Sequence, residues 1–162
     1  MAQIRPHASA RRPLYTPAER ARRDATKWTL VQGILAPVQF LAFAVSLALV
    51  TRYLLTGDGY AAATASVLVK TGLLYLIMVT GAVWEKVVFG RYLLAPAFFW
   101  EDMFSFAVIA LHTAYVVALL TGALSPSGQM VVALMAYAAY AINAAQFIRK
   151  LRMARLDMAV QA

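Results

Sequence analysis

The chain has no cysteine, only two histidines and only seven acidic residues among its 162 positions. Without cysteine it forms no disulfide, thiolate nucleophile, iron–sulfur cluster or cysteine-ligated zinc site. Its two histidines, His7 and His112, would need carboxylates arranged around them to complete a catalytic zinc site. We therefore expect a protein that binds no cofactor of its own, and we expect no role for His7 in the N-terminal tail.

Charged residues are also scarce, at 14% of the chain against 62% hydrophobic residues. Four long apolar runs stand out, at residues 30–50, 61–84, 103–124 and 130–148. A helix of about 20 mainly apolar residues crosses the ~30 Å hydrocarbon core of a bilayer. The sequence therefore predicts an all-α, polytopic membrane protein with about four transmembrane helices. We expect a basic segment at 1–27, a transmembrane domain at 28–148 and a basic tail at 149–162.

The basic residues predict how these helices are oriented. They are concentrated in the N-terminal segment, in the C-terminal tail and, as Lys86 and Arg91, between the second and third runs. Because Lys and Arg accumulate on the cytoplasmic side of membrane proteins, both termini and the middle connection are predicted to be cytoplasmic. Membrane topology and anionic lipid account for the net charge of +8, so we expect no nucleic-acid partner.

A short helix is predicted ahead of the first run. Thr16 is a typical helix cap, Pro17 suits the first helical position, and Glu19 follows the cap by three residues, which is the spacing of a capping box. We expect this basic helix to extend from Pro17 to about Lys27 and to lie on the membrane surface.

Polar residues inside the runs are candidates for function, because lipid makes them costly unless they are paired. The second run contains Lys70 and ends near Glu85, the third begins after Glu101 and Asp102, and His112 lies near its middle. The fourth run contains Asn143 and Gln146, about one helical turn apart.

Helical spacing places several of these residues on one face of the third run. Glu101, Ser105, Val108, His112 and Tyr115 follow steps of four, three, four and three. At 1.5 Å per residue, Glu101 and His112 are about 16 Å apart along the helix axis. They cannot both contact one small atom, but they can flank a large flat ligand.

The segment from Glu85 to Asp102 is too apolar for a solvated loop and too interrupted by Gly90 and Pro96 for a transmembrane helix. We expect one or two short helical pieces at the cytoplasmic interface, broken near those two residues. Its aromatic residues are predicted to form a membrane belt or the floor of a site for an aromatic ligand, with Glu85, Glu101 and Asp102 at the rim, and the two interpretations are compatible. These aromatics are Phe89, Tyr92, Phe98, Phe99 and Trp100.

Four stretches of the sequence carry a resemblance to a known family: LYTPAERARRDATKWTLVQGILAPVQF, WEKVVFGRYLLAPAFFWED, ALHTAY and NAAQF. Together they resemble the 3-vinyl bacteriochlorophyllide hydratase family, called 2-vinyl in older ring numbering, from about Pro13 to Leu156. The resemblance implies a hydro-lyase of bacteriochlorophyll synthesis that adds water to a vinyl group and gives a 1-hydroxyethyl group. Chlorophyllide a and 3-vinyl bacteriochlorophyllide both carry that group.

The resemblance also implies a location and a set of partners. We expect a bacterial inner membrane, either cytoplasmic or intracytoplasmic photosynthetic, and a magnesium tetrapyrrole substrate surrounded by membrane lipid. Association with other pigment-synthesis enzymes and homo-oligomer formation both stay open. No catalytic residue is carried over from the family.

Hydration of a vinyl group on a conjugated ring needs a proton donor for the terminal carbon and a base for the water. We predict Glu101 as the donor and Glu85 or Asp102 as its acid–base partner. His112 is predicted to hold the macrocycle, either as an axial ligand of its magnesium or as a proton relay, and Lys70 to neutralise its propionate. Further substrate contacts are predicted from Trp84, Arg91, Phe99, Trp100, Asn143 and Gln146.

Structural interpretations of the same residues remain open. Lys70 can bond a helix carbonyl, His112 and the amides of Asn143 and Gln146 can join helices, and acids at a helix start complement its dipole. Two other functions are also open. A non-catalytic pigment-binding or assembly subunit needs no proton donor, and a four-span multidrug transporter needs an acid in the first run, which has only glutamines.

Overall fold

The computed structural model describes residues 13–161, with side chains described as far as Leu156. Over this range it contains five helices and no strand: α1 (Pro17–Ala25), α2 (Lys27–Thr56), α3 (Tyr60–Phe89), α4 (Phe99–Thr121) and α5 (Pro126–Gln161). The last four are long and apolar enough to cross a membrane, which confirms the predicted all-α, polytopic fold. Residues 1–12 of the expected 1–27 segment, which include His7, lie outside the described residues.

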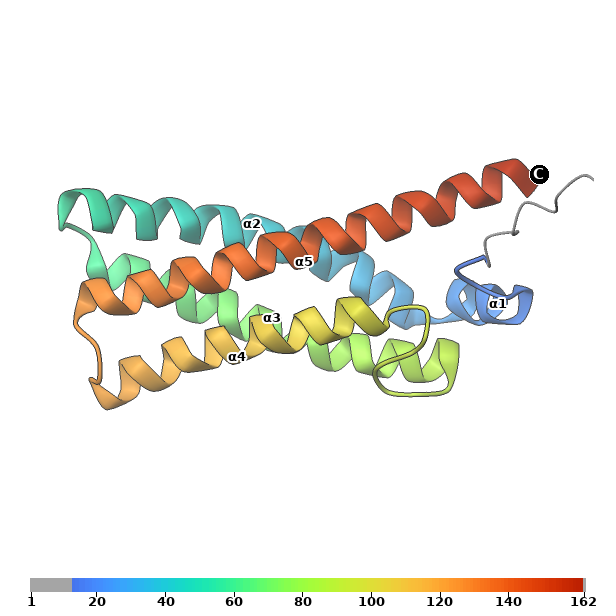
Figure 1. The fold of residues 1–162 in the computed structure, drawn as a ribbon, viewed down its shortest axis with the longest axis horizontal. Coiled ribbons are helices and arrows are strands. Elements are labelled where there is room, and N and C mark those ends of the chain that lie inside the picture. The colour runs from blue at the N-terminus through green and yellow to red at the C-terminus, as the bar shows by residue number, and fades with distance from the viewer. Residues whose placement is uncertain (1–12, 162) are drawn as a thin grey trace, which may run out of the picture.

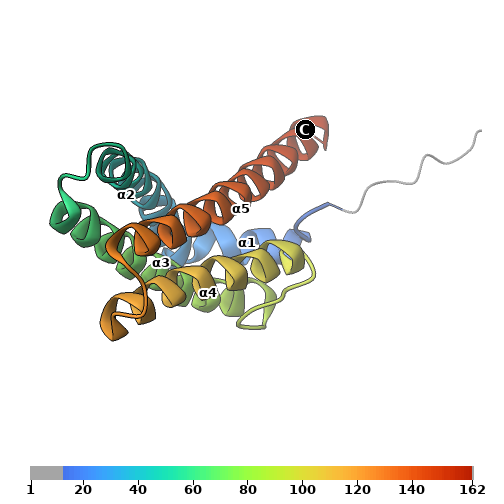
Figure 2. The same ribbon diagram turned by 60° about the vertical axis from the view of Figure 1, so that its left-hand side comes forward.

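The four long helices form two antiparallel hairpins, α2 with α3 and α4 with α5 (Figure 1). Contacts between α2 and α5 join the hairpins, whereas α3 and α4 touch at fewer places than either hairpin does internally. Figure 2 shows α5 extending beyond the other helices toward the C-terminus. It continues past residue 148, where the apolar run was predicted to end, because the basic residues that follow are good helix formers.

The connections divide between the two ends of the bundle. Tight turns join α2 to α3 and α4 to α5 at one end, and glycines with positive φ, Gly57 at 79° and Gly122 at 64°, end the helices that enter them. At the other end lie α1, the connection between α3 and α4, and the C-terminal end of α5 (Figure 1). Both ends of the described chain and the middle connection are therefore on one side, in the arrangement that the charge pattern predicts.

The N-terminal helix α1 is docked onto the bundle. Its predicted capping box is present: Thr16 accepts from the Glu19 amide, and the Glu19 carboxylate accepts from the Thr16 amide at 2.8 Å. The helix ends at Ala25, before the predicted Lys27, because the next residue caps α2. Tyr15 is buried, and its ring stacks on Phe89 with 5.8 Å between centroids. Contact with the bundle therefore holds this segment in addition to any contact with the membrane surface.

The connection between α3 and α4 is more compact than predicted. Helix α3 runs through to Phe89 and ends at Gly90, whose φ is 83°, and α4 already begins at Phe99. The predicted break near Gly90 is confirmed, but separate short helical pieces are wrong: the segment consists of two long-helix ends and a turn over residues 90–98. The apolar character of residues 85–89 and 99–102 thus belongs to membrane-crossing helices.

Tyr15→Ala should loosen α1 from the bundle, because the ring that packs on Phe89 and Phe98 is lost. Truncating a buried aromatic side chain typically costs about 3–5 kcal/mol. Amide hydrogen exchange over residues 17–25 should therefore become faster, while Tyr15→Phe, which keeps the ring, should match the unaltered protein. Unchanged protection in Tyr15→Ala would show that other contacts, such as the Arg22 bond to the Val88 carbonyl, hold the helix.

Candidate functional site

Three buried carboxyl groups gather at the end of the bundle that carries α1. Glu85 comes from the last turns of α3, and Glu101 and Asp102 come from the first turn of α4. They meet because the turn over residues 90–98 returns the chain directly beside the helix that it leaves. The structure therefore brings together the three acids that the sequence analysis selected.

Glu85 and Asp102 both bind the backbone of the connection. The Asp102 carboxylate accepts from the Leu94 amide at 2.7 Å, and Glu85 accepts from the Ala95 amide at 3.2 Å. Leu94 has a positive φ of 58°, which is rare for a side chain other than glycine, and the two acids stabilise it there. Because Leu94 and Ala95 are consecutive residues, the two carboxyl groups that bind their amides lie side by side. They form a pair that joins α3, α4 and the turn between them.

Glu101 has a different partner. Its carboxylate forms an ion pair with the Lys150 ammonium of α5 at 2.5 Å. Lys150 also lies 5.0 Å from the centroid of the Phe98 ring. In the sequence, Lys150 is recognisable only as one of the basic residues of the tail. Its spacing of seven residues, or two turns, from Asn143 would have placed both on one face of α5.

The predicted polar stripe on α4 is buried along its whole length. At its outer end the Ser105 hydroxyl donates to the Glu101 carbonyl at 2.9 Å and accepts from the Asn143 amide of α5 at 2.8 Å. Asn143 thus joins two helices, which agrees with its structural interpretation. Gln146, one turn further along, is half-buried, and its Oε1 has no hydrogen-bond partner among the described residues.

A second polar layer lies deeper in the bundle. His112 of α4 and Lys70 of α3 are both buried. The Lys70 ammonium sits 3.7 Å from the ring centroid of Tyr140, and the His112 ring lies 5.9 Å from that of Tyr137. The structure therefore places the predicted residues Lys70 and His112 in one layer and separates this layer from the three carboxyl groups.

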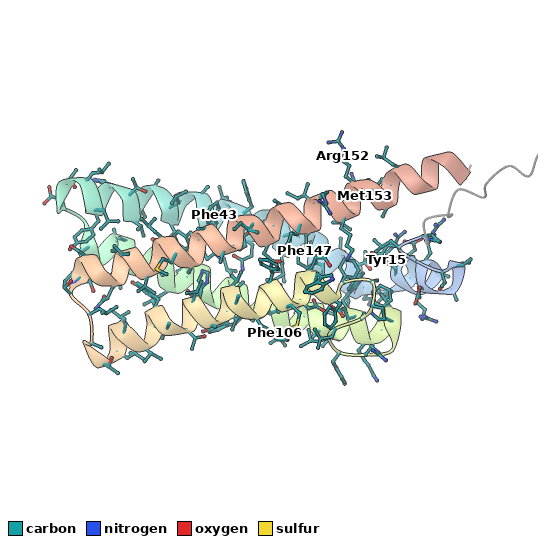
Figure 3. All side chains as sticks on the ribbon, viewed as in Figure 1. Tyr15, Phe43, Phe106, Phe147, Arg152 and Met153 are labelled. Carbon is teal, nitrogen blue, oxygen red and sulfur yellow. The ribbon has the colours of Figure 1, made fainter. Side chains whose placement is uncertain are left out.

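The predicted aromatic residues divide into two groups. Phe98 is the centre of a buried cluster that also contains Tyr15, Trp84, Phe89 and Phe147. Figure 3 shows Tyr15 and Phe147, which reach this cluster from the N-terminal segment and from α5. The Trp84 indole also donates to Thr29 of α2 at 2.9 Å.

Other predicted contact residues face outward. Trp100 is 69% exposed and Phe99 39%, and the two rings pack against each other. Arg91 is exposed in the connection. These positions suit the membrane-belt interpretation of the aromatics, whereas the cluster around Phe98 adjoins the carboxyl groups.

An open cleft of about 460 Å³ reaches this end of the bundle from outside. It is lined by Pro13, Leu14, Glu19, Phe89, Pro96, Ala97 and Lys150. Pro96 directly follows the residue whose amide binds Glu85, and Lys150 is the partner of Glu101. The cleft therefore ends at the same stretch of backbone and the same lysine that contact the buried acids.

Fold and site together define a four-span helical membrane protein with an acid–base cluster at one boundary. The family model described as 2-vinyl bacteriochlorophyllide hydratase matches residues 15–153. The chain is 73% identical over 152 residues to a 2-vinyl bacteriochlorophyllide hydratase of Cereibacter sphaeroides, which covers 93% of this chain and 94% of that protein. It is 69% identical over 155 residues to one of Rhodobacter capsulatus, which covers 95% and 90%.

The chain therefore belongs to the 2-vinyl bacteriochlorophyllide hydratase family, as the sequence motifs predicted. No solved structure matches it.

Lys150→Met should destabilise the protein more than Glu101→Gln, because it leaves a largely buried carboxylate without its cation. Leaving a buried charged group unpaired costs about 1–3 kcal/mol or more. Thermal unfolding of the two single variants and the double variant in the same detergent measures the coupling. The double variant should be more stable than Lys150→Met alone, whereas strictly additive effects would mean that the ion pair contributes nothing.

Proposed function

We propose that this protein adds water to the vinyl group of a chlorophyllide-type magnesium tetrapyrrole. An enzyme with this activity is a hydro-lyase, a class named for the reverse reaction, in which water is eliminated. The names of its relatives support the hydratase activity and the substrate class. The observation that carries the chemical proposal is that the Asp102 and Glu85 carboxyl groups bind the consecutive amides of Leu94 and Ala95 and so lie side by side.

The reaction needs one proton donor and one proton acceptor. Protonation of the terminal vinyl carbon places a cation on the carbon attached to the ring, where the conjugated system stabilises it. Water then bonds to that carbon and releases a proton to a base, so the sum of the steps is the addition of one water molecule. An acid and a base that are held side by side can perform both transfers.

Two carboxyl groups held side by side meet this requirement. Two neighbouring carboxylates repel each other in a buried site, so the pair favours a state in which one of them keeps a proton. The Glu85–Asp102 pair then carries one proton for the vinyl carbon and one carboxylate for the water. Glu101 was predicted from sequence as the proton donor. Its carboxylate instead accepts a hydrogen bond from the Lys150 ammonium. We therefore assign the proton transfers to the pair and a positioning role to Glu101 and Lys150.

Water and macrocycle are proposed to approach the pair from opposite sides. The cleft lined by Glu19 and Lys150 opens at the membrane boundary and gives water a polar path. The large flat macrocycle partitions into the membrane, so we place it on the bundle side of the pair. The turn over residues 90–98 lies between the cleft and the two acids, and its two backbone bonds to them must adjust when water passes.

Glu85→Gln and Asp102→Asn should each slow hydration, while chlorophyllide binding changes little. Loss of general acid–base catalysis costs about 10²–10⁴-fold in rate. Both amides keep an oxygen that accepts from Ala95 or Leu94, so the turn stays closed. Product formation from chlorophyllide a, followed by mass, measures turnover, and quenching of pigment fluorescence measures binding.

Glu101→Gln is the matched control and should retain turnover within about tenfold. If it abolishes hydration while the other two variants react normally, Glu101 is the donor, as the sequence analysis predicted. If all three variants turn over normally, the acids are structural. Pigment binding by an unaltered protein that forms no product would favour the pigment-binding or assembly subunit.

The orientation in the membrane is part of the same proposal. Basic residues concentrate at the end with α1, the middle connection and the tail, which supports a cytoplasmic location for that end in a bacterial inner membrane. A fluorescent protein fused after Ala162 should fluoresce, and alkaline phosphatase at the same position should be inactive, because that enzyme folds only outside the cytoplasm. The opposite pattern would reverse the topology and place the acid pair on the outer side.

A further inference from the structure

Lys150 of α5 has hydrogen-bonding capacity beyond its ion pair. A lysine ammonium carries three N–H donors. Among the described residues, Lys150 Nζ donates one hydrogen bond, to the Glu101 carboxylate at 2.5 Å. It also faces the Phe98 ring, 5.0 Å from the centroid, and an aromatic face attracts a cation without taking the place of an oxygen acceptor. Two donors of a side chain that is only 25% exposed therefore remain for water or for a ligand.

The open cleft of about 460 Å³ brings a ligand within reach of these donors, because Lys150 lines it. Lys150 is the one cation among the described residues of the lining. The carboxylate of Glu19, which also lines the cleft, already accepts from the amide and the hydroxyl of Thr16 in the helix cap. Apolar side chains supply most of the remaining lining: Leu14, Phe89, Pro96 and Ala97. Such a lining suits an apolar ligand that carries one acidic group.

The proposed substrate has this chemistry. A chlorophyllide carries a free propionate, whereas in a chlorophyll the same group is esterified with a long alcohol. A carboxylate is costly inside a membrane, so the acid arm favours the boundary, where the cleft is open, while the ring lies on the bundle side. Hydrogen bonds between an ammonium and a carboxylate are among the stronger ones that proteins form.

The position of Lys150 also suits the acid pair better than that of Lys70, the residue predicted from sequence to neutralise the propionate. Lys70 precedes Glu85 by fifteen residues on α3, which separates them by about 22 Å along the helix axis, more than the width of a tetrapyrrole ring. Lys150 instead bonds Glu101, the residue next to Asp102. One macrocycle can therefore reach Lys150 with its acid arm and the acid pair with its vinyl group.

We propose that Lys150 binds the free propionate carboxylate of the substrate and so selects unesterified tetrapyrroles. This inference rests on the proposed function, which supplies the substrate class. The ammonium bridges two carboxylates: Glu101 holds it in place, and its remaining donors bind the acid arm. Glu101 is then a positioning residue that acts through Lys150.

The test compares chlorophyllide a with its methyl ester at the propionate, which keeps the vinyl group and the magnesium. Each is titrated into the purified full-length protein in detergent, and quenching of pigment fluorescence gives Kd. The unaltered protein should bind the free acid at least about tenfold more tightly. Hydration of the ester should show a raised KM and a nearly unchanged kcat, because the reacting group is the same.

Variants assign this preference to one side chain. The double variant Glu101→Gln, Lys150→Met leaves no unpaired carboxylate and should bind acid and ester about equally. Lys150→Arg and Glu101→Gln alone should both keep the preference, because each retains a cation at position 150. Arg152→Met is the matched control: it removes the same charge from an exposed position of α5, where the side chain points away from the other helices (Figure 3), and should keep the preference.

The outcomes separate this inference from the proposed function. Equal binding of acid and ester by the unaltered protein, with normal hydration of both, overturns the Lys150 contact and leaves the hydratase standing. A preference that persists in the folded double variant, or that disappears in folded Lys70→Met, also overturns it. An unaltered protein that neither binds chlorophyllide nor forms product overturns both. The first comparison needs no variant, so the test does not depend on the folding of the double variant.

Discussion

Lipid offers no hydrogen bonds, so every polar side chain inside the four spans needs a partner in the protein or in the substrate. The described residues satisfy this constraint unevenly. At the end that carries α1, backbone amides bind Glu85 and Asp102, and Lys150 binds Glu101. In the middle, Lys70 has no hydrogen-bond partner among the described residues, and His112 is bonded through Nδ1 alone. The three boundary acids are therefore better bonded than the basic groups of the middle layer.

This division explains how so small a membrane protein can carry out a hydration. An open cleft reaches the turn that binds the acid pair, and in the proposed mechanism water uses this cleft while the apolar pigment approaches from the bundle. The pair also joins α3 to α4 through the turn that it holds, and those helices otherwise touch at fewer places than the two hairpins. The residues that we propose as catalytic are therefore also helix contacts, which makes amide substitutions the appropriate test, because they keep the acceptors.

Much of this arrangement could be predicted from the sequence. In a membrane protein, apolar runs predict the spans, basic residues predict their orientation, and helical spacing predicts which residues share a face. The four spans, the cap at Thr16 and the buried stripe from Glu101 to Tyr115 follow from those rules. Contacts between distant segments do not. The ion pair of Glu101 with Lys150 depends on how far α5 continues, and the placement of Glu85 beside Asp102 depends on how the turn at 90–98 closes. The prediction of short helical pieces between Glu85 and Asp102 was wrong, because in sequence the apolar residues at the ends of α3 and α4 resemble an interfacial segment.

The central claim is that a carboxyl group delivers a proton to the terminal vinyl carbon and that water completes the addition without an added cofactor. Hydration of chlorophyllide a by the purified protein in deuterated water tests it most directly. The account predicts a 1-hydroxyethyl product with one carbon-bound deuterium, located in the new methyl group and on no other carbon. A product without that deuterium, or one formed only when a redox or nucleotide cofactor is supplied, would contradict it.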